Sequence, residues 1–352
     1  MTLKSRPLII TMGDAAGIGP EIISKAFCGS QQETAGCVVV GDVATMRRAA
    51  ALVALHFEKP ALPVAELESL DEWDCVPTNC IGVVQRCALL IPPTFGEVSG
   101  LAGKAAAECI VWAARAVLAG EATAMVTAPI HKQALFAAGD WFARFPGHTE
   151  MLQAEAAQFL GKPISQVPVR MMLANQELKT VLVSIHMSLR NAIEAVTFDN
   201  VLQTLRITHH SVAAGLRRSP RIAVAGLNPH AGEGGLFGTE ERMIIAPAIA
   251  AALKEGIDVH GPFAPDTVFM RTRHTSLKPG EFDVVVAMHH DQGLIPVKYL
   301  GVEQGVNVTL GLPLIRTSPD HGTAFDIAGT GTADASSLLA AIRMARLLQS
   351  PP

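Results

Sequence analysis

The stretch DVVVAMHHDQGLIPVKYLG, residues 283–301, places an apolar run directly before a group of polar side chains. Residues 284–287 read VVVA, which is typical of a strand buried on both faces of a parallel sheet. The run stops at His289, His290 and Asp291. Ligands of open α/β sheets bind just beyond the carboxyl ends of such strands. The segment therefore predicts an α/β fold with a functional site at this edge of the sheet.

The rest of the chain fits the same class. Short apolar runs alternate with longer Ala- and Leu-rich helical patterns, as in α/β proteins. Residues 170–186, RMMLANQELKTVLVSIH, predict two strands around a polar turn, which form a hairpin. A length of 352 residues is large for one core and predicts two domains. Residues 56–98 are rich in Pro and Glu without clear periodicity, and we expect a surface extension there.

Composition excludes several classes of partner. The net charge of −4 and the absence of a basic cluster interleaved with aromatics argue against nucleic acid or an anionic membrane. The longest apolar helical pattern, Met243–Leu253, is far shorter than a membrane span. The six cysteines form no C-x-x-C pair, and we expect reduced thiols in a cytoplasmic protein without a signal peptide.

Three histidines follow apolar runs, or nearly so: His186, His230 and His290. A common sheet edge would bring them together, and three imidazoles with an open position suit zinc or cobalt. Such an ion would polarise a substrate oxygen. His289 is the competing ligand, but in a continued strand its side chain would face away from that of His290. We therefore favour His290.

Other polar groups suit an anionic small molecule. The pair His148-Thr149 follows a glycine, and Lys298, Asn307 and Arg316 supply two cations and an amide within a short span. Lys and Arg together suit a phosphate or a carboxylate. The glycines of residues 228–241, NPHAGEGGLFGTEE, permit close backbone approach to an anion. Neither a Walker-type nucleotide loop nor the G-x-G-x-x-G fingerprint is present.

These stretches together resemble the 4-hydroxythreonine-4-phosphate dehydrogenase family of pyridoxal phosphate biosynthesis. The resemblance rests on the following segments, which run in the family's order along nearly the whole chain: TMGDAAGIGPEI, TAPIHK, PGHTE, GLNPHAGEGGLFGTEE, HHDQGLIPVKYLG and VNVTLGLPLIRTSPDHGTAFDIAGTG. The sequence departs from the family pattern at His289, where a larger aromatic or aliphatic residue is expected. The segment between His148 and His186 is also longer than the family pattern.

The resemblance implies a two-domain α/β/α fold like that of isocitrate and isopropylmalate dehydrogenases, with the active-site cleft between the domains. The first domain, on the cofactor side, would comprise residues 1–130 and 305–352. The second, residues 131–304, would carry the metal ligands and the dimer interface. It also implies a homodimer with a shared active site.

The resemblance implies roles for particular residues as well. The metal ligands would be His186, His230 and His290, holding zinc, cobalt or magnesium. The substrate contacts would be His148, Thr149, Lys298, Asn307 and Arg316. By analogy with the wider superfamily, NAD or NADP would be bound by His321, Gly322, Thr323, Ala324 and Asp326. The general base stays open among Asp291, Asp266 and Lys298.

The implied reaction is the NAD(P)-linked oxidation of 4-phosphohydroxy-L-threonine to a β-keto acid, which decarboxylates to 3-amino-2-oxopropyl phosphate. One alternative is a paralogous dehydrogenase of another four-carbon phosphorylated hydroxy acid or of a cis-diol carboxylate. A second is a phosphate acyltransferase, which has a related fold but no use for three metal histidines. A third is a metal- or anion-binding protein without redox turnover.

Overall fold

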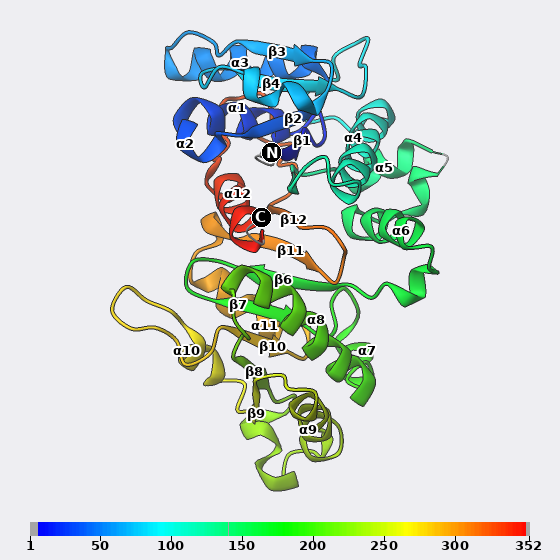
Figure 1. Ribbon diagram of the computed structural model, residues 1–352, viewed down its shortest axis with the longest axis vertical. Helices are drawn as coiled ribbons and strands as arrows, with labels where there is room; N and C mark the ends of the chain where they lie inside the picture. Colours follow the sequence, from blue (N-terminus) through cyan, green and yellow to red (C-terminus); the bar gives the residue numbers. More distant parts are fainter. Residues whose placement is uncertain (1–5, 140, 350–352) are drawn as a thin grey trace, which may run out of the picture. The chain divides into compact units, whose positions relative to one another are not determined.

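The computed structural model describes residues 6–139 and 141–349, which form two compact units of mixed α/β structure (Figure 1). Unit 1 comprises the chain up to Pro168 together with Leu312–Arg346. Unit 2 comprises Val169–Gly311 and the residues from Leu347 onward. The α/β fold predicted from the sequence is confirmed, and each unit is described by itself.

Unit 1 contains a parallel sheet in the order β3-β4-β2-β1-β5-β12. Its strands are β1 (Leu8–Thr11), β2 (Cys37–Gly41), β3 (Val64–Leu67), β4 (Ile81–Gln85), β5 (Ala124–Thr127) and β12 (Arg316–Pro319). Its longer helices are α1 (Gly19–Gly29), α3 (Val43–Phe57), α4 (Gly100–Leu118), α6 (His148–Leu160) and α12 (Ser336–Leu348), the last ending in unit 2. Shorter helices are α2 (Gln31–Thr34), η1 (Leu70–Cys75), α5 (Lys132–Ala137), η2 (Phe142–Arg144) and η3 (Ile164–Gln166).

The expectation of a surface extension over residues 56–98 is wrong for its central part. This segment supplies β3 and β4, and β4 pairs in parallel with both β2 and β3. Ile81, Val83 and Val84 of β4 are fully buried. Strands of four and five residues between proline-rich loops are too short for a periodic pattern to emerge, so the sequence did not reveal them.

Unit 2 contains a mixed sheet in the order β11-β6-β7-β10-β8-β9. Its strands are β6 (Arg170–Ala174), β7 (Lys179–Leu182), β8 (Ile222–Ala225), β9 (Val259–Phe263), β10 (Val284–Ala287) and β11 (Val306–Leu310). The predicted hairpin is confirmed as β6 and β7, and β11 pairs antiparallel with β6. The helical segments are α7 (Leu189–Glu194), α8 (Phe198–Leu216), η4 (Pro229–Gly235), η5 (Glu241–Ile245), α9 (Ala246–Lys254), α10 (Val268–Thr272), α11 (His290–Tyr299) and η6 (Val302–Gln304).

Strand β10 lies at the centre of the parallel part of this sheet. It pairs in parallel with β7 on one side and with β8 on the other, and all four of its residues are buried. The prediction of a doubly covered parallel strand is therefore confirmed. Helix α11 packs closely on this strand, because a Cβ at Gly293 would lie 3.0 Å from Ala287 Cβ and 2.4 Å from Leu182 Cδ2. The start of α11 is thus held against the carboxyl end of β10.

The division into units differs from the expected boundaries at one crossing. The chain leaves unit 1 after Pro168 rather than near residue 130, because α6 packs on α4 and stays with the first unit. Glu155 of α6, which is buried, accepts a hydrogen bond from Arg115 Nε of α4 at 2.7 Å. The return after Gly311 lies near the expected residue 305. Within the described ranges, no helix is both long and apolar enough to cross a membrane.

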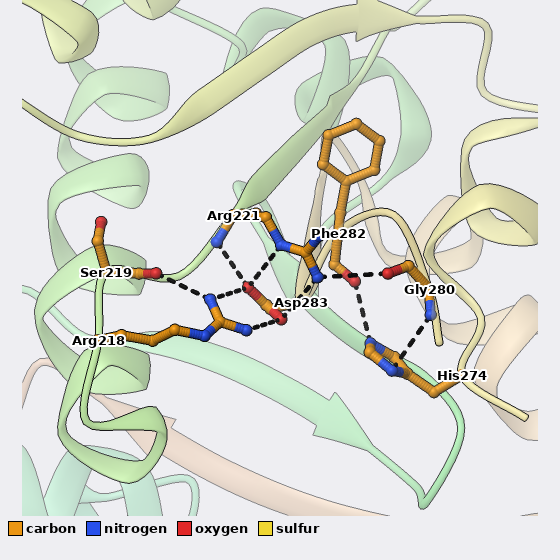
Figure 2. A network of polar contacts seen from close by, with 7 residues as sticks. All are labelled: Arg218, Ser219, Arg221, His274, Gly280, Phe282 and Asp283. Carbon is orange, nitrogen blue, oxygen red and sulfur yellow. Dashed lines mark hydrogen bonds and ion pairs between the residues drawn. The ribbon is translucent and has the colours of Figure 1, made fainter. Parts of the chain in front are cut away.

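A network of charges holds the residue that precedes β10 (Figure 2). The buried Asp283 carboxylate accepts hydrogen bonds from Arg218 Nη2 at 2.7 Å and from the Arg221 backbone N–H at 2.7 Å. The Arg221 guanidinium also donates to the Gly280 carbonyl at 3.3 Å. Burial alone would raise the pKa of Asp283, but the two arginines hold it well below its usual value. The ionised carboxylate thus fixes the entry into β10.

We expect Asp283→Asn to lower the free energy of unfolding by about 2 kcal/mol at pH 7, because it removes the charge that both arginines bind. Since the folded pKa is depressed, this stabilisation is complete above the unfolded value of 3.8 and is lost as the pH falls below it. Urea denaturation of both proteins at pH 7, 5 and 3.5 measures the difference, which should narrow at the lowest pH. Glu281→Gln, which removes an exposed ion pair with Arg271, is the control and should change little. An equal loss in both variants would contradict the assignment.

Candidate active site

The three candidate metal histidines follow three neighbouring parallel strands of unit 2. His186 comes after β7, His290 after β10 and His230 after β8, and β10 pairs with both of the others. Parallel strands present their carboxyl ends at one edge of a sheet. The chain therefore delivers all three histidine-bearing segments to the same edge.

His186 and His290 lie side by side at this edge. Their ring centroids are 5.8 Å apart, and imidazoles that ligate one tetrahedral ion have centroids roughly 5 Å apart. Both rings line a pocket of ≈ 420 Å³, whose other lining residues are Ile185, Met187, Leu189, Ala192, His289 and Asp291. Nδ1 of His290 lies 2.7 Å from Asp291 Oδ1, an arrangement that orients metal-binding imidazoles and leaves Nε2 for the ion. The donor set of this pocket fits a divalent metal.

His230 is presented by an unusual turn. Five successive residues of η4, from His230 to Gly234, have φ between 43° and 80°. Three of them are not glycine, so the backbone is strained where the histidine is held. The ring of His230 lies 6.3 Å from that of Phe237. Among residues 6–139 and 141–349, no three His, Cys, Asp or Glu side chains of one chain are grouped to hold a metal ion.

The expectation that His289 and His290 point to opposite faces of a continued strand is wrong. Strand β10 ends at Ala287, so neither histidine belongs to it. His289 instead precedes α11, and its Nδ1 accepts a hydrogen bond from the Gln292 backbone N–H at 3.4 Å. Both histidines line the pocket, and the contact of His290 with His186 is what distinguishes them.

Unit 1 carries a second cluster, centred on the buried Arg316. Its Nε and Nη2 donate hydrogen bonds to Thr127 Oγ1 at 3.0 and 2.7 Å, and Thr127 ends β5. Burial lowers the pKa of Arg316 to about 10, partly offset by Glu150, so the guanidinium stays charged at neutral pH. A buried cation of this kind is suited to binding an anion.

His148 and Thr149 begin α6 beside this arginine. The pKa of His148 lies well below its usual value, first because the imidazole is desolvated and then because Arg316 repels a second charge. The imidazole is therefore neutral at pH 7, and its buried Nε2 has no hydrogen-bond partner in the described chain. The N–H groups at the start of a 13-residue helix also attract negative charge. Three of the five expected substrate residues thus lie in unit 1.

The remaining substrate and acid/base candidates lie in unit 2. Lys298 is exposed near the end of α11, and Asn307 is partly buried on β11. Asp266 is exposed in the turn before α10. Asp291 is also exposed and is the partner of His290. The choice of a general base among Asp291, Asp266 and Lys298 stays open.

The candidate cofactor segment, residues 321–326, follows β12 in unit 1. Thr323 is buried, and its carbonyl accepts a hydrogen bond from the Ile18 N–H at 3.0 Å. A Cβ at Gly17 would lie 2.9 Å from both Thr323 Cβ and the Thr323 carbonyl oxygen, so the first glycine-rich turn fits tightly against this segment. His321 is partly buried, while Gly322 and Asp326 are exposed and Ala324 has a φ of 41°.

Several residues that support these clusters were missed in the sequence. Thr127 holds Arg316, Gln292 bonds to both Met288 and Gly226, and Glu241 bonds to Leu227 and Asn228. Thr127 and Gln292 lie within the stretches TAPIHK and HHDQG, which carry part of the family resemblance. The signal was therefore present, but only the tertiary contacts distinguish a supporting side chain from a surface one.

Comparison with known proteins places the chain in a class of enzyme, the dehydrogenases. The profile of the pyridoxal phosphate biosynthetic protein PdxA matches residues 33–345, and the chain belongs to that family of dehydrogenases. It is 49% identical over 352 residues to the 4-hydroxythreonine-4-phosphate dehydrogenase of Beijerinckia indica subsp. indica, covering 100% of this chain and 97% of the relative.

Two further comparisons concern the substrate and the fold. The D-threonate 4-phosphate dehydrogenase of Pectobacterium atrosepticum is 42% identical, with 98% of this chain and 99% of the relative covered. The crystal structure of 4-hydroxythreonine-4-phosphate dehydrogenase from Klebsiella pneumoniae superposes with a TM-score of 0.83 at 40% identity, covering 98% of this chain and 100% of that one. The family is thus shown, while its members differ in substrate.

We expect Thr127→Val to lower the free energy of unfolding by about 1–3 kcal/mol, because valine has the same shape but removes two hydrogen bonds from the buried Arg316. Chemical denaturation at pH 7 measures the change. Thr208→Val is the matched control, since this buried hydroxyl bonds only to the Thr204 carbonyl of its own helix. If Thr127→Val lowered the free energy of unfolding no more than Thr208→Val does, the hydrogen bonds to Arg316 would contribute no more than a hydroxyl bond within a helix.

Proposed function

We propose that this chain is a metal-dependent, NAD(P)-linked dehydrogenase of 4-phosphohydroxy-L-threonine in pyridoxal phosphate biosynthesis, acting in the cytoplasm. The substrate's secondary hydroxyl is oxidised, a hydride passes to the nicotinamide and a proton is released. The β-keto acid that results loses carbon dioxide and leaves 3-amino-2-oxopropyl phosphate. The observation that carries the proposal is the placement of His186 and His290 side by side at the sheet edge to which β8 also brings the His230 segment.

The histidines are proposed to hold zinc, cobalt or magnesium. A divalent ion supplies a Lewis acid that stabilises negative charge on substrate oxygen. The chain's own contribution is orientation: Asp291 fixes the imidazole of His290, and the turn of η4 fixes the backbone of His230. Nitrogen ligands favour zinc or cobalt over magnesium.

The anionic groups of the substrate are proposed to contact His148, Thr149, Lys298, Asn307 and Arg316. Arg316 is preorganised by Thr127, so binding a phosphate costs little side-chain entropy. The neutral imidazole of His148 can donate or accept a hydrogen bond without adding charge. Asp291, Asp266 or Lys298 would accept the hydroxyl proton.

Residues His321, Gly322, Thr323, Ala324 and Asp326 are proposed to contact the adenosine part of NAD or NADP. Support comes from the tight packing of this segment against the first glycine-rich turn, which gives the loop a fixed shape. A fixed loop with exposed Gly322 offers backbone groups that a nucleotide can approach closely.

The second candidate is the same oxidation of D-threonate 4-phosphate. A relative of that activity is 42% identical across nearly the whole chain, and the two substrates share the phosphate and the secondary hydroxyl. They differ in the amine of the threonine compound. A dehydrogenase of a cis-diol carboxylate has less support, because its substrate carries no phosphate for the proposed contacts with Lys298 and Arg316.

We also propose a homodimer with a shared site. The support is the exposure of apolar side chains around all three histidines: Met187 and Leu189 beside His186, Leu236 and Phe237 beside His230, and Ile295 and Tyr299 on the helix of His290. An exposed apolar surface around a site suits contact with a second copy. A shared site also accounts for the absence of a three-ligand group among the described residues of one chain.

The decisive measurement is NAD(P)H formation with 4-phosphohydroxy-L-threonine and, separately, D-threonate 4-phosphate. We expect turnover with the first substrate, its loss on chelation and its return with zinc or cobalt. His290→Ala should lower kcat/KM by about 1,000-fold or more, because it removes a ligand of the Lewis acid. Preference for the threonate would move the assignment to the second candidate. Turnover unaffected by chelation would reject the metal-dependent reaction.

The shared site makes a separate prediction. His186 and His290 lie together in one chain, so we expect a second copy to supply His230. Co-expressed His230→Ala and His290→Ala chains should then recover about a quarter of wild-type activity, since half the dimers are mixed and each has one intact site. Either variant alone is the control. No recovery in isolated mixed dimers would show that each site takes its ligands from one chain.

A further inference from the structure

We infer that Gln292 is a positioning residue for two of the proposed metal ligands, joining the segment that carries His290 to the segment that carries His230 in the same chain. In the proposed dimer these two histidines serve different copies of the site, and Gln292 fixes both. The inference rests on the proposed function, because it assumes that these histidines ligate a metal. It assigns a role to a side chain that does not line the pocket and whose hydrogen bonds go to the backbone of two segments.

The first half of the connection is local. Gln292 lies in the first turn of α11, and its Oε1 accepts a hydrogen bond from the Met288 N–H at 2.7 Å. Met288 is fully buried between the end of β10 and the two histidines. The Ser184 hydroxyl donates to the Met288 carbonyl at 2.9 Å, which ties the segment leading to His186 to the same residue. Met288 is thus fixed from both sides.

The second half crosses to the neighbouring strand. Gln292 Nε2 donates to the Gly226 carbonyl at 2.8 Å, where the chain leaves β8. Gly226 has no room for a side chain, because a Cβ there would lie 2.9 Å from Ala231 Cα and 3.1 Å from Glu241 Oε1. The segment that carries His230 therefore folds directly back on the residue that Gln292 holds.

Glu241 completes the support of this segment. Its buried Oε1 accepts hydrogen bonds from the N–H groups of Leu227 and Asn228 at 2.8 and 2.7 Å. The left-handed turn from His230 to Gly234 thus starts from a backbone fixed at Gly226, Leu227 and Asn228. Because the turn itself is strained, its geometry depends on these fixed ends. Of these hydrogen bonds, the one from Gln292 to Gly226 is the one that connects this backbone to the segment carrying His290.

The test uses the full-length protein with cobalt(II), whose visible absorption reports ligand geometry without turnover. We expect Gln292→Met, which keeps the length but loses both hydrogen bonds, to weaken cobalt affinity about 10- to 100-fold and to shift the absorption bands. Gln292→Glu keeps the acceptor for Met288 and places an oxygen against the Gly226 carbonyl. Its negative charge would attract cobalt, so weaker binding by this variant must come from lost positioning, and it serves if Gln292→Met does not fold.

Asn175→Asp is the matched control. Asn175 Nδ2 donates to the Val297 carbonyl of the same helix, α11, while its Oδ1 accepts from Glu177 and Leu178, so the variant loosens α11 without touching the histidine segments. The inference would be overturned if the Gln292 variants bound cobalt with unchanged affinity and an unchanged absorption spectrum. It would also be overturned if Asn175→Asp lowered the cobalt affinity as much as the Gln292 variants do. Wild-type protein that binds cobalt no better than His290→Ala would overturn the proposed metal site as well, which separates the two failures.

Discussion

The parallel pairing of β10 with β7 and β8 is the constraint on which the rest of unit 2 depends. All four residues of β10 are buried and apolar, so the strand itself carries no polar side chain. The side chains that can take part in catalysis therefore follow the end of the strand. Asp283 fixes the beginning of the strand through two arginines, and Gly293 allows α11 to pack against its end. A strand fixed at both ends holds His290 in a defined place beside His186.

In unit 1 the candidate binding group is a buried cation, Arg316, rather than a group of histidines. Arg316 is buried at the start of β12 and is held by a threonine hydroxyl at the end of β5. Burial lowers the pKa of Arg316 without removing its charge. Burial, and then the charge of Arg316, lower the pKa of the neighbouring His148 and keep its imidazole neutral. Imidazoles suit a metal ion, and a preorganised guanidinium suits a phosphate. We therefore propose that the histidines of unit 2 bind the metal and that Arg316 of unit 1 binds the phosphate.

Much of the support for the candidate site comes from neutral side chains that hydrogen-bond to backbone groups or, for Thr127, to the buried Arg316 side chain. Gln292, Ser184 and Thr127 neither carry charge nor line the histidine pocket, yet each fixes a segment that bears a candidate ligand or the buried arginine. Such contacts bring together residues far apart in sequence, as with Gln292 and Gly226.

The sequence alone determined the α/β class, the buried strand 284–287, the hairpin of β6 and β7, and the family, because hydrophobic patterning and long motifs are local properties of the chain. It missed β3 and β4, whose strands are too short to show a period. It also gave no sign that α6 packs on α4 and that the chain stays with unit 1 up to Pro168. Tertiary structure also decided that His289 precedes a helix rather than continuing a strand. The contacts of Gln292 and Thr127 depend on segments distant in the chain, so no local pattern could have revealed them.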